Sequence, residues 1–167
     1  MKKLILALFF VSSCASAQVY VSVSTGIVNY SAAKTTFSQS SDVSYGGAVG
    51  YQLNKYFSVE TGFSKDGSYA YKGNHTTIDE EFIAGFFSIP IRKDFFGLIG
   101  GGIVVSQSNG SKGSNSFVSP AAGFGVGYKI TDHVDVTLSS SDTGLRFINS
   151  NIKSNTISYT TGLRYIF

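Results

Sequence analysis

The sequence is poor in the residues that cross-link small exported domains and in those that build transmembrane helices. It contains one cysteine, Cys14, two prolines and no tryptophan. A single cysteine excludes an internal disulfide, so the domain must be held together by other interactions. After Ala17 no apolar run approaches the roughly 20 residues of a membrane-spanning helix. Any passage through a membrane must therefore use strands.

The chain also lacks an excess of charge of one sign. Without residues 1–17 it has 150 residues, with 11 basic and 10 acidic side chains and a net charge of +1. Nucleic-acid binding needs a basic face, so this balance argues against a nucleic-acid partner. Glycine (19 residues), tyrosine and phenylalanine (24 together) are abundant instead. This composition is typical of many strands joined by polar loops.

The first residues have the pattern of a secretory signal peptide. Lys2 and Lys3 supply the positive start, and residues 4–11 form an apolar run that is too short to span a bilayer. Ala15 and Ala17 place small residues at the two positions that signal peptidase reads. We therefore expect cleavage after Ala17, with a signal peptide over 1–17 and a single domain over 18–167.

Cys14 opens an alternative, because Val11-Ser12-Ser13-Cys14 resembles a loose lipoprotein box in which the cysteine would be lipidated. The sequence favours the Ala-x-Ala site, since Val11 is a weaker match than leucine. In both cases the chain leaves the cytoplasm.

Alternating apolar and polar residues predict eight strands in the exported domain. They are expected at Val19–Val28, Val43–Leu53, Phe57–Ser64, within Ile78–Arg92, Phe96–Ser106, Val118–Ile130, Val134–Ser140 and Thr156–Phe167. Tight turns are expected at 54–56, 93–95 and 131–133, and longer polar links at 29–42, 65–77, 107–117 and 141–155. Short turns that alternate with long links are the order found in outer-membrane barrels.

The two faces of the predicted strands differ in the size of their side chains. Around residue 125, for example, Phe124 and Val126 alternate with Gly123 and Gly125. In an eight-stranded barrel the interior is narrow, so the small and polar face should point inward and the apolar face toward lipid. A soluble lipocalin-like barrel would need the reverse. The fold prediction is an all-β, eight-stranded antiparallel transmembrane up-and-down β-barrel.

Aromatic residues gather near the predicted strand ends, where aromatic girdles lie at lipid interfaces. They are Tyr20, Tyr45, Tyr51, Tyr56, Phe57, Phe95, Phe96, Tyr128, Tyr165 and Phe167.

Several segments resemble a known family once the strands are placed. Residues 50–62 look like the second hairpin of the outer membrane protein A and X superfamily, and residues 87–91 and 123–128 resemble strands four and six of its general outer-membrane β-barrel branch. The last residues resemble the C-terminal signal read by the barrel assembly machinery, with Thr160, Gly162, Tyr165 and Phe167 at the matching positions.

This resemblance implies a bacterial outer-membrane protein with both termini in the periplasm. Its expected partners are outer-membrane lipids and lipopolysaccharide, the barrel assembly machinery during biogenesis, and an extracellular ligand at the loops. A monomer is expected.

Four charged residues fall on predicted inward faces: Glu60, Lys129, Asp135 and Arg164. The resemblance implies an interior ion-pair network. Because a lone buried charge is costly, we expect these groups to neutralise one another in a packed interior. The alternative is a gated, narrow ion path.

The sequence offers little for catalysis or for metal binding. Lipid A deacylases of this architecture carry a His-x-Ser motif, whereas His75 is followed by Thr76-Thr77 and His133 by Val134-Asp135. Neither histidine has nearby metal ligands, so no metal, cofactor or catalytic residue is predicted. We expect a structural or surface-interaction role through the external loops. The alternatives are a narrow porin-like channel and, third, a lipid-modifying enzyme.

Overall fold

A computed structural model describes residues 17–32, 41–71, 74–110, 113–146 and 153–167. These residues form eight strands that are antiparallel to their neighbours. The strands are β1 (Gln18–Ala32), β2 (Ser41–Asn54), β3 (Phe57–Tyr71), β4 (Asn74–Pro90), β5 (Phe95–Gly110), β6 (Gly113–Lys129), β7 (Val134–Arg146) and β8 (Lys153–Ile166).

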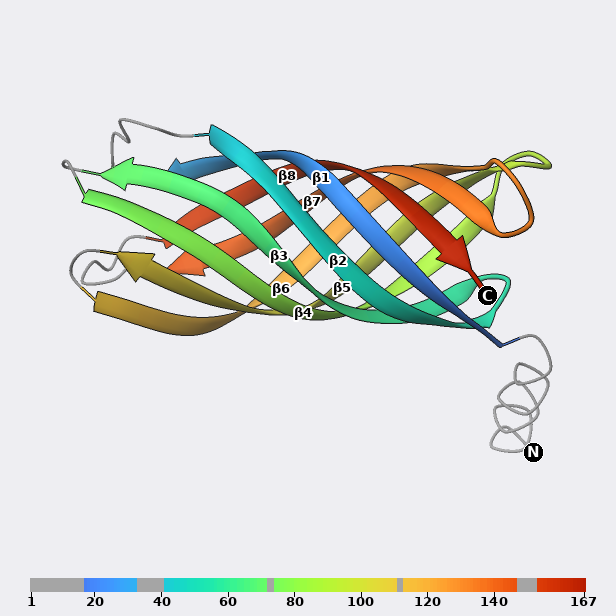
Figure 1. Ribbon diagram of the computed structural model, residues 1–167, viewed down its shortest axis with the longest axis horizontal. Coiled ribbons are helices and arrows are strands. Elements are labelled where there is room, and N and C mark those ends of the chain that lie inside the picture. Colours follow the sequence, from blue (N-terminus) through green and yellow to red (C-terminus); the bar gives the residue numbers. More distant parts are fainter. Residues whose placement is uncertain (1–16, 33–40, 72–73, 111–112, 147–152) are drawn as a thin grey trace.

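Each strand pairs with the next in sequence, and β8 returns to pair with β1, so the sheet closes into a barrel (Figure 1). Closure leaves no sheet edge, which is what a β-structure in lipid requires. The predicted fold, an all-β up-and-down barrel of eight strands, is confirmed.

The short turns β2–β3, β4–β5 and β6–β7 lie at one end of the barrel, together with the C-terminus (Figure 1). We call this the turn end and the opposite end the link end. In the β2–β3 turn the Asn54 side-chain oxygen accepts hydrogen bonds from the backbone N–H groups of Tyr56 (2.8 Å) and Phe57 (2.9 Å). Asparagine therefore fixes this turn by bonding its own backbone.

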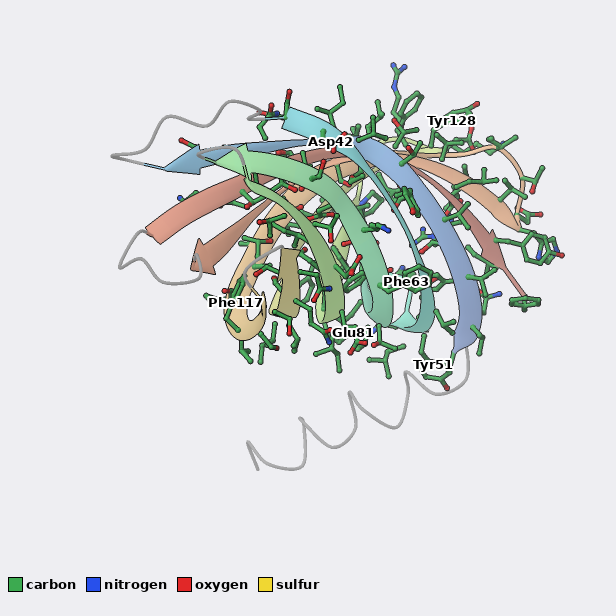
Figure 2. The ribbon with its side chains drawn as sticks, turned by 60° about the vertical axis from the view of Figure 1, so that its left-hand side comes forward. Asp42, Tyr51, Phe63, Glu81, Phe117 and Tyr128 are labelled. Carbon is green, nitrogen blue, oxygen red and sulfur yellow. The ribbon has the colours of Figure 1, made fainter. Side chains whose placement is uncertain are left out.

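The predicted orientation of the two faces is also confirmed. Val49 is 53% exposed and Phe124 is 69% exposed, whereas Ser58 is only 4% exposed. Tyr51 and Tyr128 likewise project from the outer surface (Figure 2). The exterior of the barrel is thus apolar and its interior small and polar.

The strands extend further toward the link end than the sequence predicted. β3 continues to Tyr71 instead of ending at Ser64, and β5 and β6 stay paired as far as Gly110 and Gly113. Much of the predicted long links is therefore strand. These extensions are rich in serine, asparagine and glycine, so they lack the apolar alternation by which the strands were recognised.

The predicted aromatic girdle is partly wrong. Tyr51, Tyr128, Tyr165 and similar residues do lie on the outside, but Tyr20 (1% exposed) and Phe96 (6% exposed) are buried in the interior. Side chains alternate between the two faces of a strand, so Tyr20 points to the same inward face of β1 as Ser22 and Ser24.

No helix long and apolar enough to cross a membrane occurs among the described residues.

The predicted signal peptide over 1–17 and its cleavage position remain predictions, because Cys14 and Ala15 lie outside the described residues.

Candidate functional site in the barrel lumen

The interior of the barrel contains a cavity of about 240 Å³. Serine, glycine and alanine from every strand form most of its wall. Ionisable side chains also reach it, namely Glu60, Asp66, Glu80 and Arg164. They belong to two clusters, one toward each end of the barrel.

An ion pair between Arg164 and Asp135 is the centre of the cluster at the turn end. The two residues are direct register partners on β8 and β7. The Arg164 Nε–H donates to Asp135 Oδ2 at 3.0 Å, and a second guanidinium nitrogen contacts the same oxygen. Both side chains are largely removed from solvent. Such a pair satisfies charges that would be costly to bury alone.

Two aromatic rings enclose the Arg164 guanidinium. Its central carbon lies 5.0 Å from the centroid of the Tyr20 ring and 5.5 Å from that of Phe96. A guanidinium over an aromatic face gains cation–π attraction. The Tyr20 hydroxyl also donates to Glu60 Oε2 at 3.1 Å, which brings β3 into the cluster.

Glycine on the neighbouring strand makes room for each of these rings. A Cβ atom at Gly50 would lie 2.0 Å from the Tyr20 ring, and one at Gly127 would lie 2.1 Å from the Phe96 ring. Both distances are far below van der Waals contact. The rings can therefore lie flat across the interior only because these two positions carry no side chain.

The structure brings together three of the four charged residues predicted for the interior. Glu60, Asp135 and Arg164 belong to the turn-end cluster. Lys129 does not: it is the register partner of Asp135 on β6, but its side chain is exposed at the end of the strand. Its predicted interior position is therefore wrong, because the last residue of a strand has no further layer above it to cover it.

A second cluster fills the lumen toward the link end. The Tyr30 hydroxyl donates to the backbone oxygen of Asp66, and Ser106 Oγ donates to Glu80 Oε1 at 2.8 Å. Val28 and Ile78 are fully buried beside these polar groups. Sequence reasoning missed Asp66 because this residue falls in the predicted link 65–77.

The C-terminal residues lie on the faces that the sequence predicted. Thr160 and Gly162 point toward the lumen, whereas Tyr165 and Phe167 are exposed on the outside with their rings edge to face at 5.1 Å. The Phe167 N–H donates to the Val19 oxygen at 3.0 Å, which ties the final residue to β1.

The described residues contain no group of three or more histidine, cysteine, aspartate or glutamate side chains able to hold a metal ion. His133 Nδ1 lies 2.9 Å from the Ile166 oxygen, and its ring stacks on Tyr165. This position gives His133 a structural contact at the turn end. The side chain of His75 lies outside the described residues.

Comparisons with known proteins agree with this architecture. The profile of the outer membrane protein beta-barrel domain matches residues 4–167. Neisserial surface protein A is similar in structure, with a TM-score of 0.71 at 12% identity over 91% of this chain and 99% of that one. The N-terminal β-barrel domain of Pseudomonas aeruginosa OprF has a TM-score of 0.62 at 12% identity, over 91% and 100% of the two chains.

The attachment invasion locus protein Ail of Yersinia pestis has a TM-score of 0.51 at 15% identity, over 89% of this chain and 99% of that one. No curated protein sequence matches the chain. Identities this low establish the shared fold alone, whereas the profile spans nearly the whole sequence. The chain belongs to the outer membrane protein beta-barrel family.

Proposed function

We propose that this outer-membrane barrel is a non-enzymatic structural protein that presents a polar surface outside the cell. The length of its strands carries this proposal. They run from 13 to 17 residues, whereas a tilted strand crosses the hydrocarbon core in about 9–11. Every strand is therefore longer than the hydrocarbon core requires, and its excess residues project beyond the lipid.

The projecting part lies at the link end, as the outward residues of β5 illustrate. Ile99 and Ile103 are exposed and apolar, whereas Gln107 and Asn109 further along the same face are exposed and polar. Asn109 Nδ2 also donates to Asp79 Oδ2 on β4 at 3.5 Å. Exposed polar side chains such as these are suited to contact with other molecules in water.

This proposal puts the turn end and both termini in the periplasm and the link end outside. It includes outer-membrane lipids and lipopolysaccharide as surroundings, a monomeric state, and recognition of the C-terminal segment by the barrel assembly machinery. Among the structural neighbours, Neisserial surface protein A and the attachment invasion locus protein have names that fit a role at the cell surface.

Cysteine labelling of intact cells tests this orientation. A membrane-impermeant maleimide should label Ser114→Cys, at the start of β6, without permeabilisation. It should label Lys93→Cys, in the β4–β5 turn, only after the outer membrane is opened. The reverse pattern would contradict the proposed presentation of the link end.

A narrow pore is the second candidate, and the lumen cavity of about 240 Å³ favours it. The side-chain clusters toward both ends support the structural role instead, because eight-stranded interiors are normally packed. Purified protein in planar bilayers is expected to give no steady openings. Regular unitary currents from the wild-type chain, absent in protein-free bilayers, would establish the pore and overturn our choice.

A further inference from the structure

Two neighbouring turns at the turn end contain three basic residues. Arg92 and Lys93 lie in the β4–β5 turn, and Lys129 ends β6 at the β6–β7 turn; all three are exposed. In the same two turns Asp132 is exposed, whereas Asp94 is half-buried. The exposed charge at this part of the rim is therefore predominantly positive.

One backbone hydrogen bond links the two turns, and two more close the β4–β5 turn. The Lys129 N–H donates to the Asp94 oxygen at 2.8 Å, and the N–H groups of Ile91 and Arg92 donate to the Phe95 oxygen at 2.9 and 3.1 Å. The three basic residues thus project from one connected piece of backbone.

An apolar wall lies on the outer surface next to these basic residues. Phe95 and Tyr128 are register partners, with ring centroids 4.7 Å apart, and both are exposed. Ile91 and Ile130 extend this wall and are also exposed. In the membrane, acyl chains cover such a wall, and the basic side chains then lie at the depth of the lipid phosphates.

We propose that Arg92, Lys93 and Lys129 form a binding site for the headgroup of an anionic phospholipid, with the Phe95–Tyr128 pair against its acyl chains. Exposed basic side chains at a membrane surface attract anionic lipids, and arginine in addition pairs with phosphate through two parallel hydrogen bonds. The assignment of this lipid to the periplasmic leaflet rests on the orientation proposed above.

The absence of tryptophan from the sequence permits a direct measurement. Tyr128→Trp places a single fluorophore at the site, and brominated lipids quench it on contact. In phosphatidylcholine vesicles, brominated phosphatidylglycerol should displace unlabelled lipid at least about fivefold more effectively than brominated phosphatidylcholine, as one basic residue near an anionic surface contributes about this factor.

The combined change Arg92→Gln, Lys93→Gln and Lys129→Gln, in the Tyr128→Trp background, should reduce this preference to about one. Lys65→Gln removes one positive charge from β3, away from the turn end, and should leave the preference unchanged. Heat-dependent gel mobility verifies that each variant is folded. Because both leaflets of the vesicle contain the same lipid, the result does not depend on which end of the barrel faces outward.

A preference near one in the Tyr128→Trp parent, or a preference that survives the triple substitution, would overturn the proposal. Loss of the preference on addition of soluble glycerol phosphate would also overturn it, because a free phosphate ester would then be the occupant. If only the cysteine labelling gave the reverse pattern, the lipid site would be assigned to the outer leaflet instead of the periplasmic one, and the site itself would stand.

Discussion

At the scale of single residues, the barrel holds charged side chains in a narrow interior lined mainly by small residues. Arg164 and Asp135 compensate each other at the turn end. Asp66 and Glu80 are two acidic groups that interact with each other near the link end. The alternation of inward and outward residues predicted the first pair, because both residues lie on inward faces of adjacent predicted strands. It could not locate the second, since no apolar alternation surrounds Asp66.

The first prediction concerns the loss of one partner from the ion pair. Arg164→Met keeps an unbranched, though shorter, side chain but leaves Asp135 buried without a counter-charge, so the free energy of unfolding should fall by about 3 kcal/mol. Urea titration of the folded protein in lipid vesicles measures this loss. The double variant Arg164→Met with Asp135→Leu should recover most of it, and a single variant as stable as the wild type would contradict the ion pair.

The second prediction concerns the acidic pair. Glu80→Gln keeps an oxygen that accepts the hydrogen bond from Ser106 and removes a carboxyl group whose ionised form is costly to bury beside Asp66. The variant should therefore be more stable at neutral pH, by roughly 1 kcal/mol. Asp142→Asn, an exposed acidic residue of β7, is the matched control and should show little change. Destabilisation by Glu80→Gln in the same titration would mean that its charge is required.

At the scale of strands, alternation decides which residues could be predicted. The apolar outer faces of strands such as β2 and β6 were predicted because lipid contact demands large apolar side chains at every second position. The link-end extensions were missed because there both faces of a strand meet water or polar neighbours. The interior position of the Tyr20 ring was missed for a different reason. The ring fits inside the barrel only because Gly50 lies opposite it on β2, and which residues lie opposite each other depends on the register of the two strands.

Substitution of glycine by alanine should have opposite effects on stability at the inner and outer faces of the barrel. Gly127→Ala places a methyl group against the buried Phe96 ring and should destabilise the barrel by about 2 kcal/mol. Gly97→Ala meets only Ile91 and Ile89 at ordinary contact distances and should raise stability by roughly 0.5 kcal/mol. Comparison of the two urea midpoints provides the measurement, and equal effects would show that the inner position is not tightly packed.

At the scale of the whole molecule, closure of the barrel is the property that sequence reasoning established most firmly. It follows from a physical requirement, since an open sheet would leave unpaired backbone groups in lipid. The register between β1 and β8, from Tyr20 with Ile166 to Ala32 with Ser154, meets this requirement. That register depends on side-chain packing around the full circumference, so no local pattern predicts it.

Closure predicts a characteristic behaviour on gels. A closed barrel should resist detergent until heated, so unheated and boiled samples of the membrane fraction should migrate differently. Thr161→Pro removes a backbone N–H from β8, which is paired on both sides, and should abolish the shift. Thr161→Ala keeps the N–H and should retain it. A Thr161→Pro variant that still shifts with heat would argue against pairing at this position.

The seam between β1 and β8 also governs the kinetics of folding. Because Tyr20 must find Ile166 at the far end of the polypeptide, the contacts that complete the cylinder have the greatest possible sequence separation, which makes their formation slow. Until β1 and β8 pair, every intermediate has two unpaired edge strands that can associate with other chains. The rate at which the seam forms therefore determines how long these unpaired strands stay exposed.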